Sequence, residues 1–365
     1  MTKHVLPHCD TSQDYSCEKP ILRYTEGGRY LRVSFSRSPG MEWNQENFVK
    51  AGGVRGVCKG FTFGSRRRML DRLNQVSTAA DLPDFVTCTL PDDCFQDSVS
   101  DFAKTAKLHL QTLLKRVVRV VPTACGFWRI EWKARKSGEH IGKLFPHFHL
   151  MMWGLPQRVV SKDEEGKEIL ESYVPVVDAQ QSFASLAKHV LSEYTFEKRS
   201  QGERFTDRVF RHNYRVEDAE YIAEKRGREH SFMSFFDWVS LSWYHVVGTG
   251  NVQHFMAGCR VEKIKSWGGV LSYCAKYMSK ADAEGFLAEE STGRNWGIFN
   301  RAYMPWAKMI ELPLPDDAGI RLRRIMRRYL ERQTGKKINR HFGMTLYCQP
   351  AQFLPLVAPP PDTPY

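Results

Sequence analysis

The sequence predicts an α+β protein built on a central antiparallel sheet flanked by helices. Two segments, 124–134 and 145–153, alternate apolar and polar residues at the period of a strand, and about ten residues separate them. So short a connection joins antiparallel rather than parallel strands. Other segments, from about residue 98 and over 321–332, repeat apolar residues at helical spacing. A chain of 365 residues that is 42% hydrophobic can fill the core of such a fold.

Local patterns place the elements of the first half of the chain. Residues 1–45 are polar and rich in turn residues, so we expect an irregular segment. Ser65 should cap a helix with an apolar stripe formed by Met69, Leu70, Leu73 and Val76. Residues 85–90 predict a strand. A long helix should begin near Ser98 and bury Phe102, Ala106, Leu110, Leu113 and Leu114.

The second half is predicted in the same way. A charged hairpin is expected around 163–166, followed by a helix capped by Asp178. Residues 238–247 predict a further strand, and 321–332 predict a helix with arginines on one face. The segment 355–365 is rich in proline and should be disordered.

The charge of the chain favours a polyanionic partner. Lys and Arg number 53 against 41 Asp and Glu, which gives a net charge of +12. Such a balance is typical of nucleic-acid-binding proteins, although a ribosome-associated or membrane-surface protein also fits it.

Cysteine usage and the N-terminal segment indicate a cytoplasmic protein. The nine cysteines are scattered and form no CxxC pair, as expected of reduced thiols. The chain starts without an apolar signal region, and no run approaches the roughly 18 apolar residues of a membrane span. We therefore expect neither secretion nor insertion into a membrane.

Two histidines on one predicted strand form a candidate metal site. His147 and His149 are two residues apart, so on a strand they share a face. A hairpin turning at 137–140 opposes residues whose numbers sum to about 278, which pairs Glu131 with His147 and Arg129 with His149. The other face is then wholly apolar and carries Trp128, Ile130, Trp132, Phe148, Leu150 and Met152.

This cluster of two imidazoles and a carboxylate suits Mn²⁺ or Mg²⁺, with imidazole favouring Mn²⁺. The alternative is a pair of surface histidines on a solvated hairpin. If Glu131 is not the third ligand, then Glu139, His140 and His245 are the other candidates.

A second motif places two tyrosines and two lysines on one helical face. Tyr273, Lys276, Tyr277 and Lys280 fall within about 100° of arc, while the apolar residues lie opposite. A tyrosine hydroxyl with a pKa of about 10 needs cations or a base nearby to act as a nucleophile. Two lysines and a divalent ion provide them, and the lysines also neutralise a phosphate under attack. The alternative is a core-facing aromatic stripe with lysines reaching to solvent.

The His-hydrophobic-His strand followed by YxxK on a helix resembles the HUH endonuclease superfamily, in particular the rolling-circle replication initiators of phages and plasmids. The segments 85–91 and 293–297 resemble further motifs of these initiators. The resemblance covers about residues 60–310. It implies an antiparallel, commonly five-stranded sheet flanked by helices.

The resemblance also implies an activity and roles for individual residues. His147 and His149 become metal ligands, Tyr273 the first nucleophile, Tyr277 a second nucleophile and Lys276 the motif lysine. The expected reaction nicks and rejoins single-stranded DNA at a replication origin through a 5′-phosphotyrosine. A host helicase and polymerase would be further partners, in a bacterial cytoplasm. A tyrosine transposase of the same superfamily and a non-enzymatic single-stranded nucleic-acid-binding protein are the alternatives.

The expected domain organisation follows from these assignments. Residues 1–45 form the irregular segment, and 46–312 form the endonuclease domain with an insertion at about 157–235. Residues 313–345 form a basic helical region and 346–365 a proline-rich tail. We expect Arg129 to contact DNA, together with Arg321, Arg324, Arg327 and Arg328 of the basic helix. The alternative for that helix is a solvated outer face on an element docked to the core.

Overall fold

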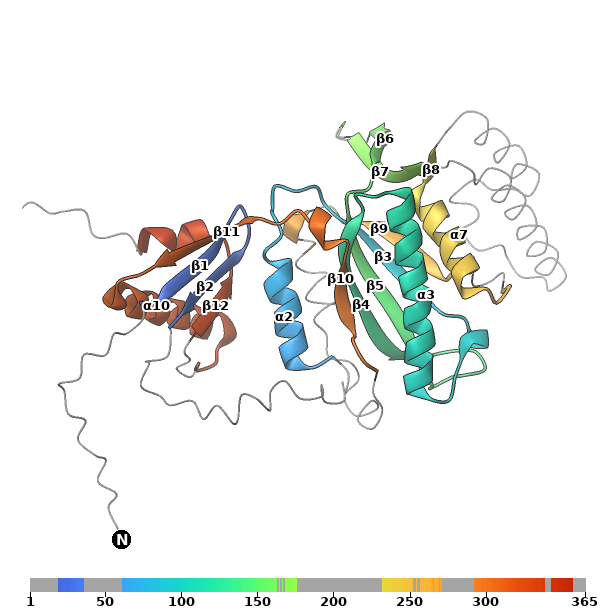
Figure 1. Cartoon of the computed structure of the whole chain (residues 1–365), viewed down its shortest axis with the longest axis horizontal. Coiled ribbons are helices and arrows are strands. Elements are labelled where there is room, and N and C mark those ends of the chain that lie inside the picture. Colours follow the sequence, from blue (N-terminus) through green and yellow to red (C-terminus); the bar gives the residue numbers. More distant parts are fainter. Residues whose placement is uncertain are drawn as a thin grey trace, which may run out of the picture. The chain divides into compact units, whose positions relative to one another are not determined.

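The structure is a computed structural model of the whole chain. It describes the residues 19–35, 61–162, 164, 166, 168–175, 232–251, 254, 257–264, 266–268, 270, 292–338 and 343–356. These residues divide into two compact units (Figure 1). The central unit contains Gly56–Leu70 and Asp81–Pro305, and the terminal unit contains Met1–Arg55, Asp71–Ala80 and Trp306–Tyr365. The strands and helices confirm the α+β class.

The central unit is built on a five-stranded antiparallel sheet. The order across the sheet is β10-β4-β5-β3-β9. In chain order the strands are β3 (Asp84–Thr89), β4 (Cys125–Ala134), β5 (Leu144–Trp153), β9 (Cys259–Lys263) and β10 (Trp296–Phe299). Three of these strands match predicted segments to within one residue, because their alternating patterns are long or end at a proline.

The register of the β4–β5 hairpin is the predicted one. Glu131 opposes His147, and Arg129 opposes His149. The apolar side chains of both strands lie on one face, where Ile130, Trp132, Phe148, Leu150 and Met152 are buried in the main core. A slip of one residue would have moved these side chains to the opposite face, so the burial of the apolar set fixes the register.

Helix α3 (Val99–Val120) covers the apolar face of this sheet (Figure 1). The hydroxyl of Ser98 accepts a hydrogen bond from the backbone N–H of Asp101, which caps the helix at the predicted residue. The predicted stripe is buried, with Phe102, Ala106, Leu110, Leu113 and Leu114 in the same core as the sheet.

Helix α7 (Phe235–Val247) packs on the same face and corrects a prediction. Residues 238–247 are predicted as a strand but are helical. The segment is apolar on nearly every side, and even Ser240 and Ser242 are buried, so its pattern fits both periods. In the helical conformation Trp243 packs against Phe148 and His109, and this tertiary packing favours the helix over a strand.

Helix α2 (Phe63–Leu73) also begins earlier than predicted. The backbone N–H of Ser65 donates to the hydroxyl of Thr62, 3.3 Å away. Thr62 is therefore the capping residue and Ser65 already lies in the first turn.

A small three-stranded sheet follows the main hairpin, in the order β6-β7-β8. Its strands are β6 (Gln157–Lys162), β7 (Glu168–Pro175) and β8 (Phe232–Ser234). The β6–β7 pair confirms the charged hairpin predicted around 163–166. The helix predicted after Asp178 lies outside the described residues.

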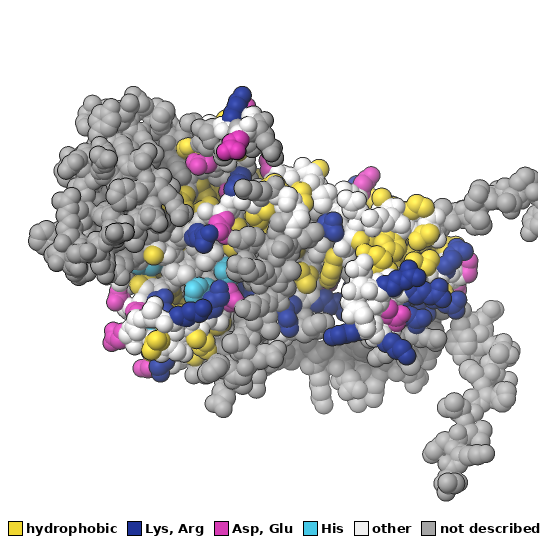
Figure 2. All heavy atoms as spheres, turned by 180° about the vertical axis from the view of Figure 1, so that it is seen from behind, with side chains coloured by type: hydrophobic (Ala, Val, Ile, Leu, Met, Phe, Trp, Pro, Cys, Tyr) yellow, Lys and Arg dark blue, Asp and Glu magenta, His cyan; other side chains and the backbone are white. Residues whose placement is uncertain are grey.

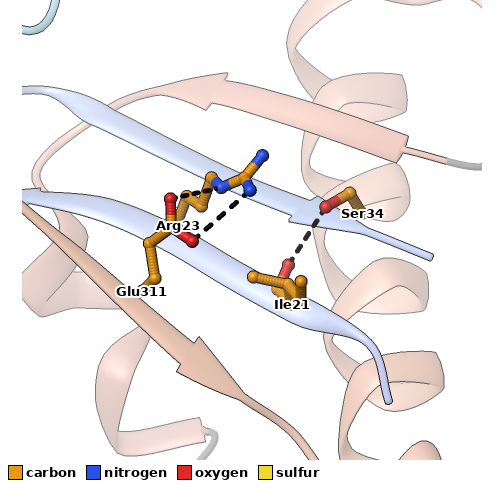
Figure 3. Close-up of polar contacts among 4 residues, drawn as sticks. All are labelled: Ile21, Arg23, Ser34 and Glu311. Carbon is orange, nitrogen blue, oxygen red and sulfur yellow. Dashed lines mark hydrogen bonds and ion pairs between the residues drawn. The ribbon is translucent and has the colours of Figure 1, made fainter. Parts of the chain in front are cut away.

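The terminal unit contains a four-stranded antiparallel sheet in the order β11-β1-β2-β12. The strands are β1 (Ile21–Glu26), β2 (Tyr30–Ser34), β11 (Lys308–Pro313) and β12 (Gly343–Tyr347). Arg23 of β1 forms an ion pair with Glu311 of β11, and the hydroxyl of Ser34 donates to the carbonyl of Ile21 across the β1–β2 pair (Figure 3). This sheet therefore joins residues nearly 290 positions apart.

Helix α10 (Asp316–Thr334) packs on one face of this second sheet. Leu322 and Met326 are fully buried against Leu22, Leu31 and Val33. The helix ends at Gly335, whose φ of 65° is the left-handed conformation that terminates helices at low cost.

At both chain ends the described residues are more regular than expected, while the rest of each segment lies outside the described residues. The segment 1–45 is predicted to be irregular, but its described part forms β1 and β2. The segment 346–365 is predicted as a disordered tail, but its described part completes β12 and adds two 3₁₀ turns, η5 (Pro350–Gln352) and η6 (Leu354–Leu356). β1 and β2 pair with each other as a local hairpin, and their outer partners β11 and β12 lie at the other end of the chain.

Among the described helices, none combines the length and the apolar composition that crossing a membrane requires.

Candidate functional site

The candidate site lies on the polar face of the central sheet, opposite α3 and α7. Its residues come from β3, β4 and β5. Glu131 of β4 opposes His147 of β5, which in turn opposes Thr89 of β3. Two residues further along β5, His149 lies opposite Thr87 of β3. Because directly opposed residues of antiparallel strands share a face, the sheet brings these side chains together.

His149 is held at both ring nitrogens. Its Nε2 atom lies 2.8 Å from Oε2 of Glu131, and its Nδ1 atom lies 3.2 Å from the hydroxyl of Thr87. The ring also stacks on Phe85, with centroids 5.6 Å apart. Only 2% of His149 is exposed, so its orientation is set by these three contacts.

The electrostatics of the pair favour a neutral imidazole and a charged carboxylate. Burial lowers the pKa of His149, which outweighs the raising effect of Glu131. For Glu131, burial raises the pKa, but hydrogen bonds with His149 and Lys133 prevail and lower it to about 2. At neutral pH the Nε2–H of His149 therefore donates to the Glu131 carboxylate, and Nδ1 accepts from the Thr87 hydroxyl.

His147 lies on the same face and is half-buried. Burial lowers its pKa to about 4, and the positive charge of Lys133 acts in the same direction. A neutral imidazole keeps a lone pair for a metal ion, so both histidines have the protonation state of ligands.

Two donor atoms, one on His149 and one on Glu131, lie at the spacing that a divalent ion requires of neighbouring ligands. Neighbouring ligands of an octahedral ion, each about 2.1 Å from it, lie about 3.0 Å apart. The 2.8 Å between His149 Nε2 and Glu131 Oε2 is close to that value. Within the described ranges, however, no three His, Cys, Asp or Glu side chains gather at metal-ligand spacing. The imidazole–carboxylate pair is thus present, and His147 is the residue on this face with the chemistry of a third ligand.

One cation contacts the carboxylate of the site, and two others act on its histidines. Lys133 Nζ lies 2.8 Å from Oε2 of Glu131. Arg135 is held by Asp92, with 2.6 Å between Nε and Oδ1, and by the carbonyl of Leu90. Arg129 is fully buried, with its guanidinium 4.3 Å from the ring centroid of Phe61.

The burial of Arg129 corrects its predicted role. With an exposed fraction of 0%, its guanidinium cannot reach a DNA backbone at the surface. Its position in a central strand, on the face that Phe61 covers, explains the difference. Its charge instead contributes to the lowered pKa of His149.

The alternative third ligands lie elsewhere. Glu139 is exposed in the β4–β5 turn. His140 stacks on Phe95, which packs against the core on the apolar side of the sheet. His245 is exposed on α7, which covers that same apolar side. Of the four candidates, Glu131 alone lies on the face of the two histidines.

The segment 293–297, one of the two additional motif segments of the sequence, forms the edge of this site. Trp296 of β10 opposes Arg129 of β4 and so lies on the polar face, partly exposed. A side chain at Gly297 would come within 2.7 Å of the Trp128 ring, so β10 can pair with β4 only with glycine there.

The predicted nucleophiles Tyr273 and Tyr277, with Lys276 and Lys280, lie outside the described residues. Sequence reasoning also missed Thr87 and Lys133, which contact the His149–Glu131 pair directly. Strand register would have revealed Thr87, because β3 adds a third strand to the predicted hairpin.

The arginines of α10 form a second feature. Arg321, Arg324, Arg328 and Arg332 are exposed and follow one another at helical spacing, and we call them the arginine stripe. Figure 2 shows Lys and Arg side chains gathered on the terminal unit, which carries α10.

Arg327 does not belong to this stripe. It is half-buried, and its Nε atom lies 3.9 Å from the carboxylate of Glu331. Arg332 follows Arg328 at helical spacing and is exposed, so it completes the stripe.

No family model, curated protein or solved structure matches this chain.

Proposed function

We propose that this protein is a metal-dependent, tyrosine-dependent nuclease that nicks and rejoins single-stranded DNA at a replication origin. The observation that carries the proposal is the Glu131–His149 pair, with atoms 2.8 Å apart on the face that also holds His147. A buried carboxylate in contact with one neutral imidazole, with a second neutral imidazole on the same face, offers donors of the kind that catalytic Mn²⁺ and Mg²⁺ sites use.

The chemistry divides between this site and the YxxKYxxK segment. When bound, the divalent ion polarises the scissile phosphate. The Tyr273 hydroxyl loses its proton as Oη bonds to phosphorus, and the bond to the 3′ oxygen breaks. The products are a 5′-phosphotyrosine and a free 3′-OH, which takes up one proton. Lys276 and Lys280 offset the charge on the phosphate, and Tyr277 attacks in the reverse direction to rejoin strands.

The arginine stripe is the feature that favours DNA as the substrate. Its four exposed guanidinium groups, on a chain of net charge +12, suit contacts with a phosphate backbone. A replication initiator of this kind leaves a 3′-OH for a host polymerase and requires a host helicase to separate the strands, within a bacterial cytoplasm.

The test is nicking of the supercoiled replicon that encodes the protein. We expect the purified chain to produce open circles with Mn²⁺ or Mg²⁺ and none with EDTA. His149→Ala should abolish nicking, because it removes a ligand. His245→Ala is the matched control, since this exposed histidine lies on the helix that covers the opposite face of the sheet.

Two results would refute the proposal. Nicking that survives EDTA or His149→Ala would exclude the Glu131–His149 site as the catalytic centre. Tight binding to single-stranded DNA with no nicking at any metal concentration would favour a non-enzymatic binding protein.

A further inference from the structure

A cation already contacts the carboxylate of the candidate metal site. The Oε2 atom of Glu131 lies 2.8 Å from both His149 Nε2 and Lys133 Nζ. One oxygen therefore accepts from two nitrogens, and it is the oxygen whose distance to His149 fits a metal ligand. A divalent ion bound there and the Lys133 ammonium compete for the same atom.

We propose that Lys133 is a positioning residue that competes with the divalent ion for Glu131 and so weakens metal binding in the absence of DNA. The inference rests on the proposed function, because it takes Glu131 and His149 as ligands. It adds a residue that controls how readily the ion binds.

Among Lys133, Arg129 and Arg135, only Lys133 contacts the Glu131 carboxylate, and it has the properties of a movable competitor. Its side chain is 37% exposed, and it has a flexible four-carbon stem that reaches solvent. Arg135 is held by Asp92 and the Leu90 carbonyl and stacks on Phe145, 4.2 Å from the ring centroid. Arg129 is enclosed on all sides.

The charge of Lys133 also acts at a distance. It lowers the pKa of His147 and His149, in addition to its 2.8 Å contact with Glu131. A unit charge beside a divalent ion changes the ion's affinity on the order of tenfold or more, even with water-like screening. Removing that charge should therefore strengthen metal binding rather than weaken it.

The test measures Mn²⁺ affinity by calorimetric titration of the full chain without DNA. Lys133→Met keeps most of the length of the side chain and removes its charge, and we expect its Mn²⁺ dissociation constant to fall about tenfold. Lys133→Arg keeps the charge and should bind less tightly than Lys133→Met. Lys136→Met is the matched control, because Lys136 is exposed in the same hairpin, and it should stay within about twofold of wild type.

A double variant locates the effect. Adding Glu131→Gln to Lys133→Met should cancel the gain, because both cations compete for the Glu131 carboxylate. Lys133→Gln repeats the single substitution with a polar side chain, and melting curves establish that each variant is folded.

The outcomes separate the two proposals. If wild type binds Mn²⁺ and both Lys133→Met and Lys133→Gln bind it equally or more weakly, the competition is refuted while the metal site stands. If neither wild type nor any variant binds Mn²⁺ or Mg²⁺ up to millimolar concentration, the metal site and the inference both fail.

Discussion

The Oε2 atom of Glu131 lies 2.8 Å from the Nε2 atom of His149, across two neighbouring strands of one sheet. The pair is almost completely buried, with 2% of His149 and 4% of Glu131 exposed. A buried imidazole–carboxylate contact requires further partners to hold its orientation, and Thr87 and Lys133 provide them.

Thr87 should control the metal affinity of His149 through the tautomer of the ring. Without a metal, Nδ1 accepts from the Thr87 hydroxyl, but coordination through Nε2 requires the ring proton to lie on Nδ1. A hydroxyl can donate in one state and accept in the other. Thr87→Val removes this partner at constant shape, and we expect Mn²⁺ affinity to fall about tenfold.

Thr87→Ser keeps the hydroxyl and should bind Mn²⁺ as wild type does. Calorimetric titration of both variants makes the comparison. If Thr87→Val binds Mn²⁺ with wild-type affinity, the hydroxyl does not orient the ring.

The arginine stripe should determine the salt dependence of DNA binding. Each phosphate contact contributes about 0.7–0.9 to the slope of log K against log salt. Arg324→Ala combined with Arg328→Ala should therefore reduce that slope by about 1.5 and weaken binding to all sequences alike. Affinity for a single-stranded oligonucleotide at several salt concentrations gives the slope.

The matched control uses two arginines of the same helix that are held by the protein. Arg323 lies 4.5 Å from the ring centroid of Phe35, and Arg327 lies 3.9 Å from Glu331. Arg323→Ala combined with Arg327→Ala should leave the slope unchanged. Equal slopes for both double variants and wild type would leave the stripe as a solvated surface.

His254 should make the protein less stable in acid. Its Nε2–H donates to the carbonyl of Thr89, which also accepts from Trp243. The Nδ1 atom is buried and has no hydrogen-bond partner among the described residues, so a proton there finds no acceptor.

Burial lowers the pKa of His254, and Arg135 and His109 add to this against the raising effects of Thr89 and Asp93. The unfolded chain therefore binds more protons than the folded one at pH values below the ordinary pKa of 6.5. The free energy of unfolding should fall as the pH drops through that value, by at most about 1.4 kcal/mol per pH unit from this group.

His254→Gln keeps a donor for Thr89 and cannot be protonated. Urea unfolding at about pH 7.5 and about pH 5.5 should show a smaller loss of stability in the variant than in wild type. The same loss in both proteins would mean that His254 is protonated equally in the folded and unfolded chains.

The sequence predicts the β4–β5 hairpin and its register because the alternation runs through both strands and the turn between them is short. It also predicts α3 at its capping residue Ser98. The same reasoning fails for α7, where Trp238 to Val247 is apolar on almost every side and tertiary packing decides the period.

The pairing of the terminal unit's hairpin β1–β2 with β11 and β12 could not be predicted from local patterns. Leu22, Leu31 and Val33 do alternate with polar residues, but their partners Leu322 and Met344 lie about 300 residues further along the chain. For the candidate site, residue spacing identifies His147, His149 and Glu131. The contributions of Thr87 and Lys133 depend on a third strand and on side-chain geometry, which spacing does not encode.

The identity of the nucleophile tests the central claim most directly. The purified chain should be incubated with single-stranded DNA of its own replicon and Mn²⁺, digested with protease, and the DNA-linked peptide sequenced by mass spectrometry. We predict a 5′-phosphate ester on Tyr273, lost with EDTA and in Tyr273→Phe, while Tyr273→Phe retains DNA binding. An adduct on Tyr277 in the wild-type protein would reverse the order of the two tyrosines. Cleavage without any tyrosine-linked DNA would contradict the account.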